Sequence, residues 1–386
     1  DGVVTILAAG NATLRAGQPG NDTYLPADSV DRVLVIGRKP LRVTARDSQR
    51  PYGEANPAFA FDYDGFVGDD GAGDLDQLPA AACAATPQSA PGNYAIVLEG
   101  GNDGNYALDL HGGTLTVVKA GQGITFPPLP ARTYGDAAFA LAASATSGLP
   151  VSYISLDESV ATVAGHLVTI HGAGTATLRA EQPGDGNFEP AAPADQALTV
   201  LRRPLLATAD NQSRQTGEAN PPLTITFTGF VLGDTADDLD APPVAACAAK
   251  PGSPAGDYPI VLSGGADDNY DLTLVNGILS VGKSAQTIAF APLADQTYGD
   301  APFGLSASAT SGLPVSFQSL DHSVVTVAGD TATIVGAGTA IIRASQPGDA
   351  LYGAAPNIDR SFTVRPHELV VTAENQQRPY GTPNPA

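Results

Sequence analysis

The sequence predicts an all-β protein that consists of small β-sandwich modules in tandem. Gly and Pro, which number 43 and 32 among the 386 residues, separate short apolar runs of β-branched and aromatic residues. Such runs suit strands, whereas Gly, Pro and Asp suit turns. Within the runs, apolar and polar residues alternate with a period of two, and the whole pattern repeats along the chain. These features favour many short strands over helices.

The repeat has a period of 164 residues. RPYGEANP at 50–57 returns as RQTGEANP at 214–221 and as RPYGTPNP at 378–385. Because no insertion or deletion interrupts this interval, it indicates duplication of a structural unit. Other landmarks at the same interval are Arg15, Arg179 and Arg343, the TYGD motifs that begin at Thr133 and Thr297, and Cys83 and Cys247.

Each period divides into two unlike halves of about 82 residues, which we call module B and module A. The expected division is the C-terminal part of an A module at 1–37, B modules at 38–119 and 202–283, A modules at 120–201 and 284–365, and the start of a further B module at 366–386. Because both ends match only parts of modules, we expect a segment of a longer array. The junctions contain no Gly/Ser-rich tether, so the modules should form an elongated semi-rigid rod. Four whole modules would span on the order of 120–160 Å.

In the first B module, strands are expected within 41–46, 58–66, 94–101 and 105–119. Gly112-Gly113 interrupts the last segment, and Asn276-Gly277 takes its place in the second copy. Such pairs favour the tight turn of a β-hairpin. One short helical turn is expected at 74–78.

In the first A module, residues 159–180 are expected to form a hairpin with one buried face, with the turn at the Gly-Ala-Gly of 172–174. The Ala-rich stretch 139–150 could suggest a helix. Its apolar residues Phe139, Leu141, Ala143 and Ala145 fall on alternate positions, however, so we expect a strand. Six or seven short strands in 82 residues indicate a small sandwich.

The charge balance disfavours two classes of partner. Lys and Arg number 19 against 40 Asp and Glu, and the net charge is −21. Nucleic acids and anionic membranes are both bound through basic residues. Apolar runs of about 18 residues, which a membrane-spanning helix needs, do not occur in this sequence. No signal peptide opens it. We therefore expect neither a nucleic acid partner nor a membrane span in this segment.

The motifs of the two modules resemble two known domain types, and together these resemblances cover essentially the full chain. LRVTA at 41–45, RPYGEANP, GFVGD at 65–69 and NYAIVLEGG at 93–101 resemble the MBG ("mostly beta, glycine-rich") module of the YGX type. Such modules occur in large repetitive bacterial surface and secreted proteins. SGLPVSYISLDESVATVAG at 147–165 and GAGTATLRAEQPGD at 172–185 are similar to bacterial Ig-like domains of invasin- and intimin-type adhesins. The resemblance implies an adhesin on the bacterial surface.

The RPYG phrase is interpreted as architecture. Gly53 would adopt a positive φ in a tight turn, and Asn56-Pro57 favours an Asx-type turn. The ring of Tyr52 would cover the end of the module. Thr216 replaces this tyrosine in the second copy, which argues against a ligand-stacking role. The same structural role of turn and aromatic plug is expected for the TYGD residues Tyr134, Gly135, Tyr298 and Gly299.

The 164-residue repeat does not return any set of residues suited to catalysis. No His recurs at an equivalent position: His111, for example, is matched by Val275 and His166 by Asp330. The chain is therefore not expected to be an enzyme. The recurring Arg179 and its equivalents should point outward, either into solvent or to a salt bridge with the neighbouring module. Cys83 and Cys247 are expected to be buried free thiols, with pairing between chains as the alternative.

The acidic loops VGDDGAGDLD (67–76) and LGDTADDLD (232–240) are the candidate cation sites. Clustered carboxylates and carbonyls can supply the six to eight oxygen ligands of Ca²⁺. The alternative is a pair of solvated turns, and the ligand order of an EF-hand is missing. The candidate ligands are Asp70, Asp74, Asp76, Asp234, Asp238 and Asp240. No other cofactor is expected.

The expected function is that of a structural stalk in a bacterial extracellular adhesin, which projects a binding region from the cell surface. One alternative is a segment of a self-assembling extracellular filament, and another is a Ca²⁺- or glycan-binding repeat module. Expected partners are neighbouring modules of the chain, other copies of it in a filament, and a host or environmental surface contacted by regions outside this sequence. The expected location is secreted or on the bacterial surface.

Overall fold

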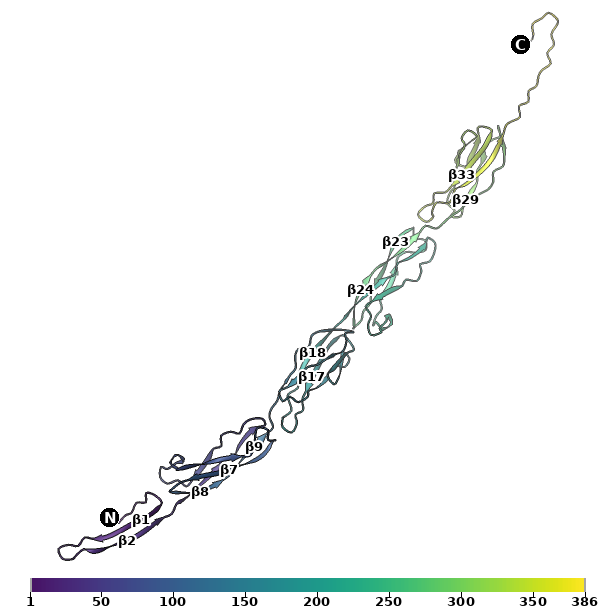
Figure 1. Cartoon of the computed structure of the whole chain (residues 1–386). Helices are drawn as coiled ribbons and strands as arrows, with labels where there is room; N and C mark the ends of the chain where they lie inside the picture. Colours follow the sequence, from purple (N-terminus) through teal and green to yellow (C-terminus); the bar gives the residue numbers. More distant parts are fainter. Residues whose placement is uncertain (1, 385–386) are drawn as a thin grey trace. The chain divides into compact units, whose positions relative to one another are not determined.

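The computed structural model describes residues 2–384 and divides the chain into two compact units, 1–201 and 202–386 (Figure 1). The described residues form β-strands and two single 3-10 turns, η1 Ala72–Asp74 and η2 Ala236–Asp238, with no α-helix. The all-β prediction is confirmed. The boundary between the units falls at one of the predicted module boundaries. The finer division into six segments stays a prediction, and its end segments 1–37 and 366–386 extend beyond the described residues.

The first B module is a sandwich of two sheets. One sheet has the order β5 (Phe61–Asp64), β3 (Lys39–Ala45), β8 (Tyr106–His111). The other has the order β4 (Ser48–Pro51), β9 (Gly113–Val118), β7 (Gly92–Asn102), β6 (Gln77–Cys83). Leu41, Val43, Ile96 and Leu115 are fully buried between the two sheets. Alternation along each strand places these side chains on the inner face.

The second B module repeats this topology. Its three-stranded sheet has the order β21 (Ile225–Thr228), β19 (Arg203–Ala209), β24 (Tyr270–Val275). Its four-stranded sheet has the order β20 (Gln212–Gln215), β25 (Gly277–Gly282), β23 (Gly256–Ser263), β22 (Val244–Cys247). Ile260 and Leu279 take the positions of Ile96 and Leu115 in the core.

The first A module has three small sheets. Their orders are β10 (Ile124–Thr125) with β13 (Ser144–Ala145); β11 (Arg132–Thr133), β18 (Ala194–Leu201), β17 (Gly174–Glu181), β14 (Ser152–Ser155); and β12 (Phe139–Ala140), β16 (Leu167–Ile170), β15 (Ala161–Ala164). The fully buried Val168, Leu178 and Leu198 come from the two larger sheets, so their inner faces supply the core.

The second A module has the same arrangement. Its sheets are β26 (Ile288–Phe290) with β29 (Ala307–Ala309); β27 (Gln296–Thr297), β34 (Ile358–Arg365), β33 (Gly338–Ser345), β30 (Ser316–Ser319); and β28 (Phe303–Gly304), β32 (Thr331–Ile334), β31 (Val325–Ala328). Near the N-terminus, β1 (Gly10–Gln18) and β2 (Ala27–Ile36) form an antiparallel pair. They correspond to β33 and β34 of the whole module.

Two predicted hairpins are wrong. β8 and β9 belong to different sheets, so Gly112-Gly113 lies where the chain crosses from one sheet to the other. Both glycines serve close backbone approach, because a Cβ on Gly113 would lie 2.6 Å from the carbonyl oxygen of Ala45. In the A module, β15 and β16 do form a hairpin, but residues 172–174 link β16 to β17 in the other sheet.

Two smaller predictions also change. The stretch 139–150 is extended as predicted, but it forms two short strands, β12 and β13, in different sheets. The helical turn predicted at 74–78 lies slightly upstream as η1, where the Asp74 carboxylate accepts a hydrogen bond from the Gly71 N–H (2.8 Å). An acidic residue at that place satisfies a free donor of the turn.

Residues 366–379 form no strand, although LVVTA at 369–373 matches the sequence of β3. In both whole B modules, the first strand lies between two partners, β5 and β8 in the first copy. The apolar side chains of Leu369, Val370 and Val371 are exposed.

Candidate functional site

A buried arginine organises the RPYG corner of each B module. The Arg50 side chain is only 3% exposed. It donates hydrogen bonds to Asn56 Oδ1 (2.7 Å), to the Pro51 carbonyl (3.0 Å) and to the Thr86 carbonyl (2.5 Å). The Asn56 amide in turn donates to the carbonyl of Ala85 (2.8 Å). The guanidinium therefore fastens residues 50–56 to the loop at 85–86.

The second B module builds the same corner. Arg214 donates to Asn220 Oδ1 (2.7 Å), to the Gln215 carbonyl (3.0 Å) and to the Lys250 carbonyl (2.6 Å). The Asn220 amide donates to the carbonyl of Ala249 (2.8 Å). Sequence reasoning missed this arginine, although its recurrence at 50, 214 and 378 within the repeated phrase was the available signal.

The other residues of the phrase hold the turn. Gly53 has φ +88°, as predicted, and its N–H donates to the Pro87 carbonyl (3.0 Å). Asn56 does not act as a local Asx-turn residue, because both ends of its amide bond across the corner. Pro57 follows in irregular, exposed chain.

A buried glutamine organises the facing loop of the first A module. Gln182 is buried, and its Oε1 accepts hydrogen bonds from the Gly184 N–H and from the Gln122 amide (2.8 Å). The Gln122 amide also donates to the Glu189 carbonyl (2.8 Å), and Ser147 Oγ donates to Gln122 Oε1 (2.5 Å). The second A module repeats this network with Gln286, Ser311, Gln346, Gly348 and Gly353. Buried polar networks that are satisfied in this way rigidify a structure.

The RPYG corner of the first B module and the Gln182 loop of the first A module meet at the joint between these two modules. The linker residue Ala120 donates its N–H to the Asn187 carbonyl (2.9 Å) and accepts a hydrogen bond from the Glu189 N–H (2.9 Å). Tyr52 packs edge-on against Phe188, with ring centroids 5.5 Å apart and planes at 79°. Such aromatic pairs contribute about 0.5–1.5 kcal/mol beyond area burial. The linker is therefore held on both sides.

The corresponding joint of the second unit uses different side chains. Thr216, which replaces the tyrosine, is 8% exposed and donates through Oγ1 to the Gly282 carbonyl (2.9 Å). Its own carbonyl accepts a hydrogen bond from Ser284 Oγ. The linker residue Ser284 exchanges backbone hydrogen bonds with Leu351 and Gly353 (both 2.9 Å). Hydrogen bonds thus replace the aromatic contact.

The TYGD residues lie at the opposite end of each A module. Gly135 and Gly299 adopt φ of +82° and +102° in the turn. The Tyr134 N–H donates to the Leu201 carbonyl (2.9 Å), and the Tyr298 N–H donates to the Arg365 carbonyl (2.8 Å). The side chain of Tyr134 is buried as expected of a plug, whereas Tyr298 is 48% exposed.

The three candidate aspartates of the first acidic loop make separate hydrogen bonds. Asp70 accepts from the Tyr106 hydroxyl (2.6 Å) and Asp76 from the Gly104 N–H (2.8 Å), while Asp74 caps η1. In the second copy, Asp234, Asp238 and Asp240 bond to Tyr270, Thr235 and Asp268. Among residues 2–384, no group of three or more His, Cys, Asp or Glu is arranged to hold a metal ion. The calcium interpretation stays an untested prediction.

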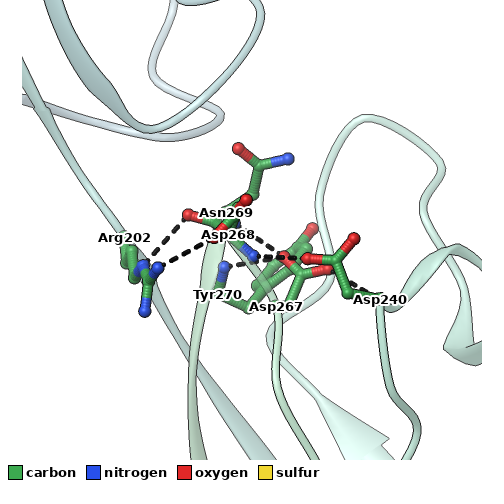
Figure 2. Close-up of polar contacts among 6 residues, drawn as sticks. All are labelled: Arg202, Asp240, Asp267, Asp268, Asn269 and Tyr270. Carbon is green, nitrogen blue, oxygen red and sulfur yellow. Dashed lines mark hydrogen bonds and ion pairs between the residues drawn. The ribbon is translucent and has the colours of Figure 1, made fainter.

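A buried aspartate ties this acidic loop to the neighbouring loop, as Figure 2 shows for the second B module. Asp267 accepts hydrogen bonds from the backbone N–H groups of Asn269 (2.7 Å), Tyr270 (2.9 Å) and Asp240 (3.2 Å). Arg202, which directly precedes β19, bonds to the Asp268 carboxylate (3.0 Å).

The equivalent residue of the first B module is Asp103. Burial raises the pKa of the Asp103 carboxyl, but N–H donors of Asn105, Asp76 and Tyr106 and the charge of Arg38 outweigh it. The net pKa therefore lies below the ordinary value for aspartate. The acidic loops thus act as internal ties in both copies.

The recurring arginines pair within their own modules. Arg179 on β17 bonds to Asp195 on β18, directly across the strand pair, with distances of 2.8 and 2.9 Å. The same bidentate pair forms in the other copies between Arg15 and Asp31 and between Arg343 and Asp359. The expectation of solvent or a neighbouring module is therefore corrected: opposite charges at paired strand positions attract each other locally.

Cysteine and histidine lie outside these joints. Cys83 and Cys247 are free and half-buried, packed against the cores of the two B modules. His111 contacts Asp109 (2.8 Å), and His171 contacts the Thr162 hydroxyl (2.8 Å). Each of these histidines contacts a single polar neighbour at an exposed site.

Sheet topology and joints together define a tandem β-sandwich repeat protein. The family model of the MBG domain (YGX type) matches residues 41–116 and 205–280, which lie within the two B modules. The YGX-type resemblance of the B modules is thereby confirmed at both positions. The Ig-like assignment of the A modules stays a prediction.

Among curated proteins, none matches the sequence. Among solved structures, Drosophila N-cadherin EC1-4 is 12% identical over 72% of this chain and 83% of that chain, with a TM-score of 0.23. The human desmocollin-1 ectodomain is 7% identical over 71% of this chain and 68% of that one, with a TM-score of 0.27. The surface layer protein SbsC, domains 1–6, is 14% identical over 86% and 55%, with a TM-score of 0.19. TM-scores this low carry no inference about this chain.

Proposed function

We propose that this chain is a stalk segment of a bacterial extracellular repetitive adhesin, in which it holds a binding region away from the cell surface. The observation that carries the proposal is the joint between B and A modules. The linker residue Ala120 recurs as Ser284, and both exchange backbone hydrogen bonds with a loop of the A module. From the B module, Tyr52 packs on Phe188 in the first copy, and the Thr216 carbonyl accepts a hydrogen bond from Ser284 Oγ in the second. Both copies therefore order the linker between the modules, although through different contacts from the B module.

The extracellular location is part of the same proposal. It is supported by the two YGX-type MBG domains, because such modules resemble parts of large bacterial surface and secreted proteins. Among the described residues, no helix is long and apolar enough to cross a bilayer. Neighbouring modules are the partners that the joints supply, and the adhesive contact itself belongs to regions outside this sequence.

Small-angle scattering tests the stalk directly. A compact globule of 386 residues would have a radius of gyration of about 21 Å. A rod of the length expected from module size, on the order of 120–160 Å, would have a radius of gyration of about 35–46 Å. The proposal predicts a value in the second range at low concentration. A value near that of the globule would overturn it, and growth of the particle with concentration would favour a filament instead.

A further inference from the structure

The first two strands of the first B module, β3 and β4, run parallel to its last two strands, β8 and β9, in one common register. Residues 39–44 of β3 pair with 106–111 of β8, and residues 48–51 of β4 pair with 115–118 of β9. The offset between partners is 67 residues in both stretches. The pairing therefore continues in register although the chain changes sheets between the two stretches.

The second B module has the same arrangement with the same offset. Residues 203–208 of β19 pair with 270–275 of β24, and residues 212–215 of β20 pair with 279–282 of β25. Both copies thus have six partner pairs in one sheet and four in the other. The agreement shows that the register is a property of module B.

Specific contacts keep the register where the chain changes sheets. Asp47 Oδ1 accepts a hydrogen bond from the Thr114 N–H (2.7 Å), and Asn211 Oδ1 accepts one from the Ile278 N–H (2.8 Å). Gly113 allows the backbone of β9 to approach Ala45 closely. At the exit, the Tyr52 N–H donates to the Val118 carbonyl (2.8 Å). The paired length therefore runs from residues 39 and 106 at one end to residues 51 and 118 at the other, and these contacts span the gap at 45–47.

The A modules pair their ends over a much shorter length. In the first A module, only residues 132–133 of β11 pair in parallel with 200–201 of β18, in addition to an isolated bridge between Ala120 and Phe188. The second A module has the equivalent pair at 296–297 and 364–365 and the bridge between Ser284 and Tyr352. Two partner pairs and one bridge stand against ten pairs in module B.

Parallel pairing of the ends determines how tension acts on a module. In parallel strands the N-terminal ends lie together, so entry at residue 39 and exit at residue 118 lie at opposite ends of the paired length; Figure 1 accordingly places β8 and β9 toward opposite ends of this module. Pulling these points apart slides the two stretches along each other. Sliding loads all of the inter-strand hydrogen bonds together, whereas peeling would break them one at a time. A longer paired length, which we call the clamp of the module, therefore raises the barrier to forced unfolding.

We propose that the B modules are the mechanically more resistant modules of the chain and that the A modules unfold first under tension. The array then has a built-in order of unfolding: an overload extends A modules while the clamps of the B modules hold. The order follows from the strand pairing alone. That tension acts on the protein in use rests on the proposed stalk function.

Single-molecule force spectroscopy of the full chain, held by its two ends, tests the order. Fully extended, a module of 82 residues spans about 270–295 Å, so each whole module gives one recognisable extension step, shortened by its folded length. At constant force we expect two early steps from the A modules and two late steps from the B modules. Four steps with indistinguishable lifetimes at that force would overturn the inference.

A pair of double variants assigns the late steps. D47A with N211A removes the acceptor that joins the two paired stretches in each B module. The late steps should then occur about two- to five-fold sooner, the change expected from losing one modest hydrogen bond. D74A with D238A is the matched control, because it removes acceptors that bond only three residues away. It should leave the late steps unchanged.

The remaining outcomes are equally decisive. If D47A with N211A accelerates the early steps and spares the late ones, the order is reversed and the inference fails. Equal far-ultraviolet circular dichroism of both double variants at zero force confirms that the comparison concerns folded protein; should the first fail to fold, the milder D47S with N211S, whose shorter side chains withdraw the acceptor, takes its place. A compact particle in scattering would refute the stalk function without contradicting the proposed order of unfolding.

Discussion

The buried arginine of the RPYG corner gives the sharpest mutational prediction. Replacing Arg50 by Ala leaves Asn56 Oδ1 and the carbonyls of Pro51 and Thr86 without their charged donor. Each hydrogen bond to a charged group is worth about 1.5–3 kcal/mol, and such losses are not additive. Because the site is almost fully buried, water cannot replace all three donors at once. We expect the first B module to lose about 3–5 kcal/mol of its free energy of unfolding.

Differential scanning calorimetry measures this loss. For a module of about 82 residues, each kcal/mol lowers the melting temperature by about 4–8 °C, so the transition of the first B module should fall by at least about 12 °C. R214A should move the transition of the second B module instead. Lysine at position 50 should recover only part of the loss, because its compact ammonium lacks the planar fork of the guanidinium.

The control is R46A, which removes an exposed arginine paired with Asp62 on the adjacent strand. It should leave the transition where it is, since exposed ion pairs contribute little. A calorimetric trace of R50A that overlays the wild type would refute the reasoning, because it would mean that water or neighbouring groups satisfy the corner without the guanidinium.

Three further predictions concern proteolysis at the joints, the melting temperature at low pH and the effect of Ca²⁺ on the melting temperature. Y52A should make the linker at 119–123 of the first joint more sensitive to limited proteolysis, while T216A, which removes a hydrogen bond and no aromatic contact, should affect only the second joint; equal cleavage of the wild type and Y52A would argue against the Tyr52–Phe188 contact. Serine hydroxyls lower the pKa of Asp157 and Asp321, and the N–H donors around Asp103 lower its pKa. A depressed carboxyl pKa contributes stability above the unfolded value of about 3.9 and loses it as pH falls through the folded pKa, so the melting temperature should be level near neutral pH and fall below about pH 4, less steeply in D103N. Excess Ca²⁺ or a chelator should leave the melting temperature unchanged, because the loop aspartates already accept hydrogen bonds from donors of the protein; a rise with Ca²⁺ that D76A abolishes would support the calcium interpretation.

Periodicity predicted the strands well because it depends only on which face of each strand is buried. The alternation of Phe139, Leu141 and Ala143 predicted extended chain, and in the structure Leu141 is buried and Phe139 and Ala143 are half-buried, whereas residues 140 and 142 are exposed. Local signals could not assign strands to sheets. Gly112-Gly113 has the sequence of a hairpin turn, yet the partner of each flanking strand lies far away in the sequence, β3 for β8 and β7 for β9.

The candidate site was predictable only in part, for a related reason. The turn role of Gly53 follows from its own backbone freedom, whereas the role of Arg50 depends on carbonyls that the fold brings from residue 86. An arginine in a polar phrase looks solvated until its acceptors are located. The salt bridge of Arg179 was misassigned for the same cause, because Asp195 becomes its neighbour only through strand pairing.

The constant offset between the ends of module B has a consequence for how its sequence can vary. Residues added in the loops between 52 and 105, outside β5, β6 and β7, leave the partners of 39–51 unchanged, so these loops can lengthen, shorten or receive grafted peptides with little effect on the ends. A single residue inserted at 45–47 would instead shift every later partner by one and turn its side chains to the wrong face. It could be tolerated only with a matching insertion at 112. Insertions and deletions should therefore be tolerated in the loops in the middle of the module and excluded from its paired ends.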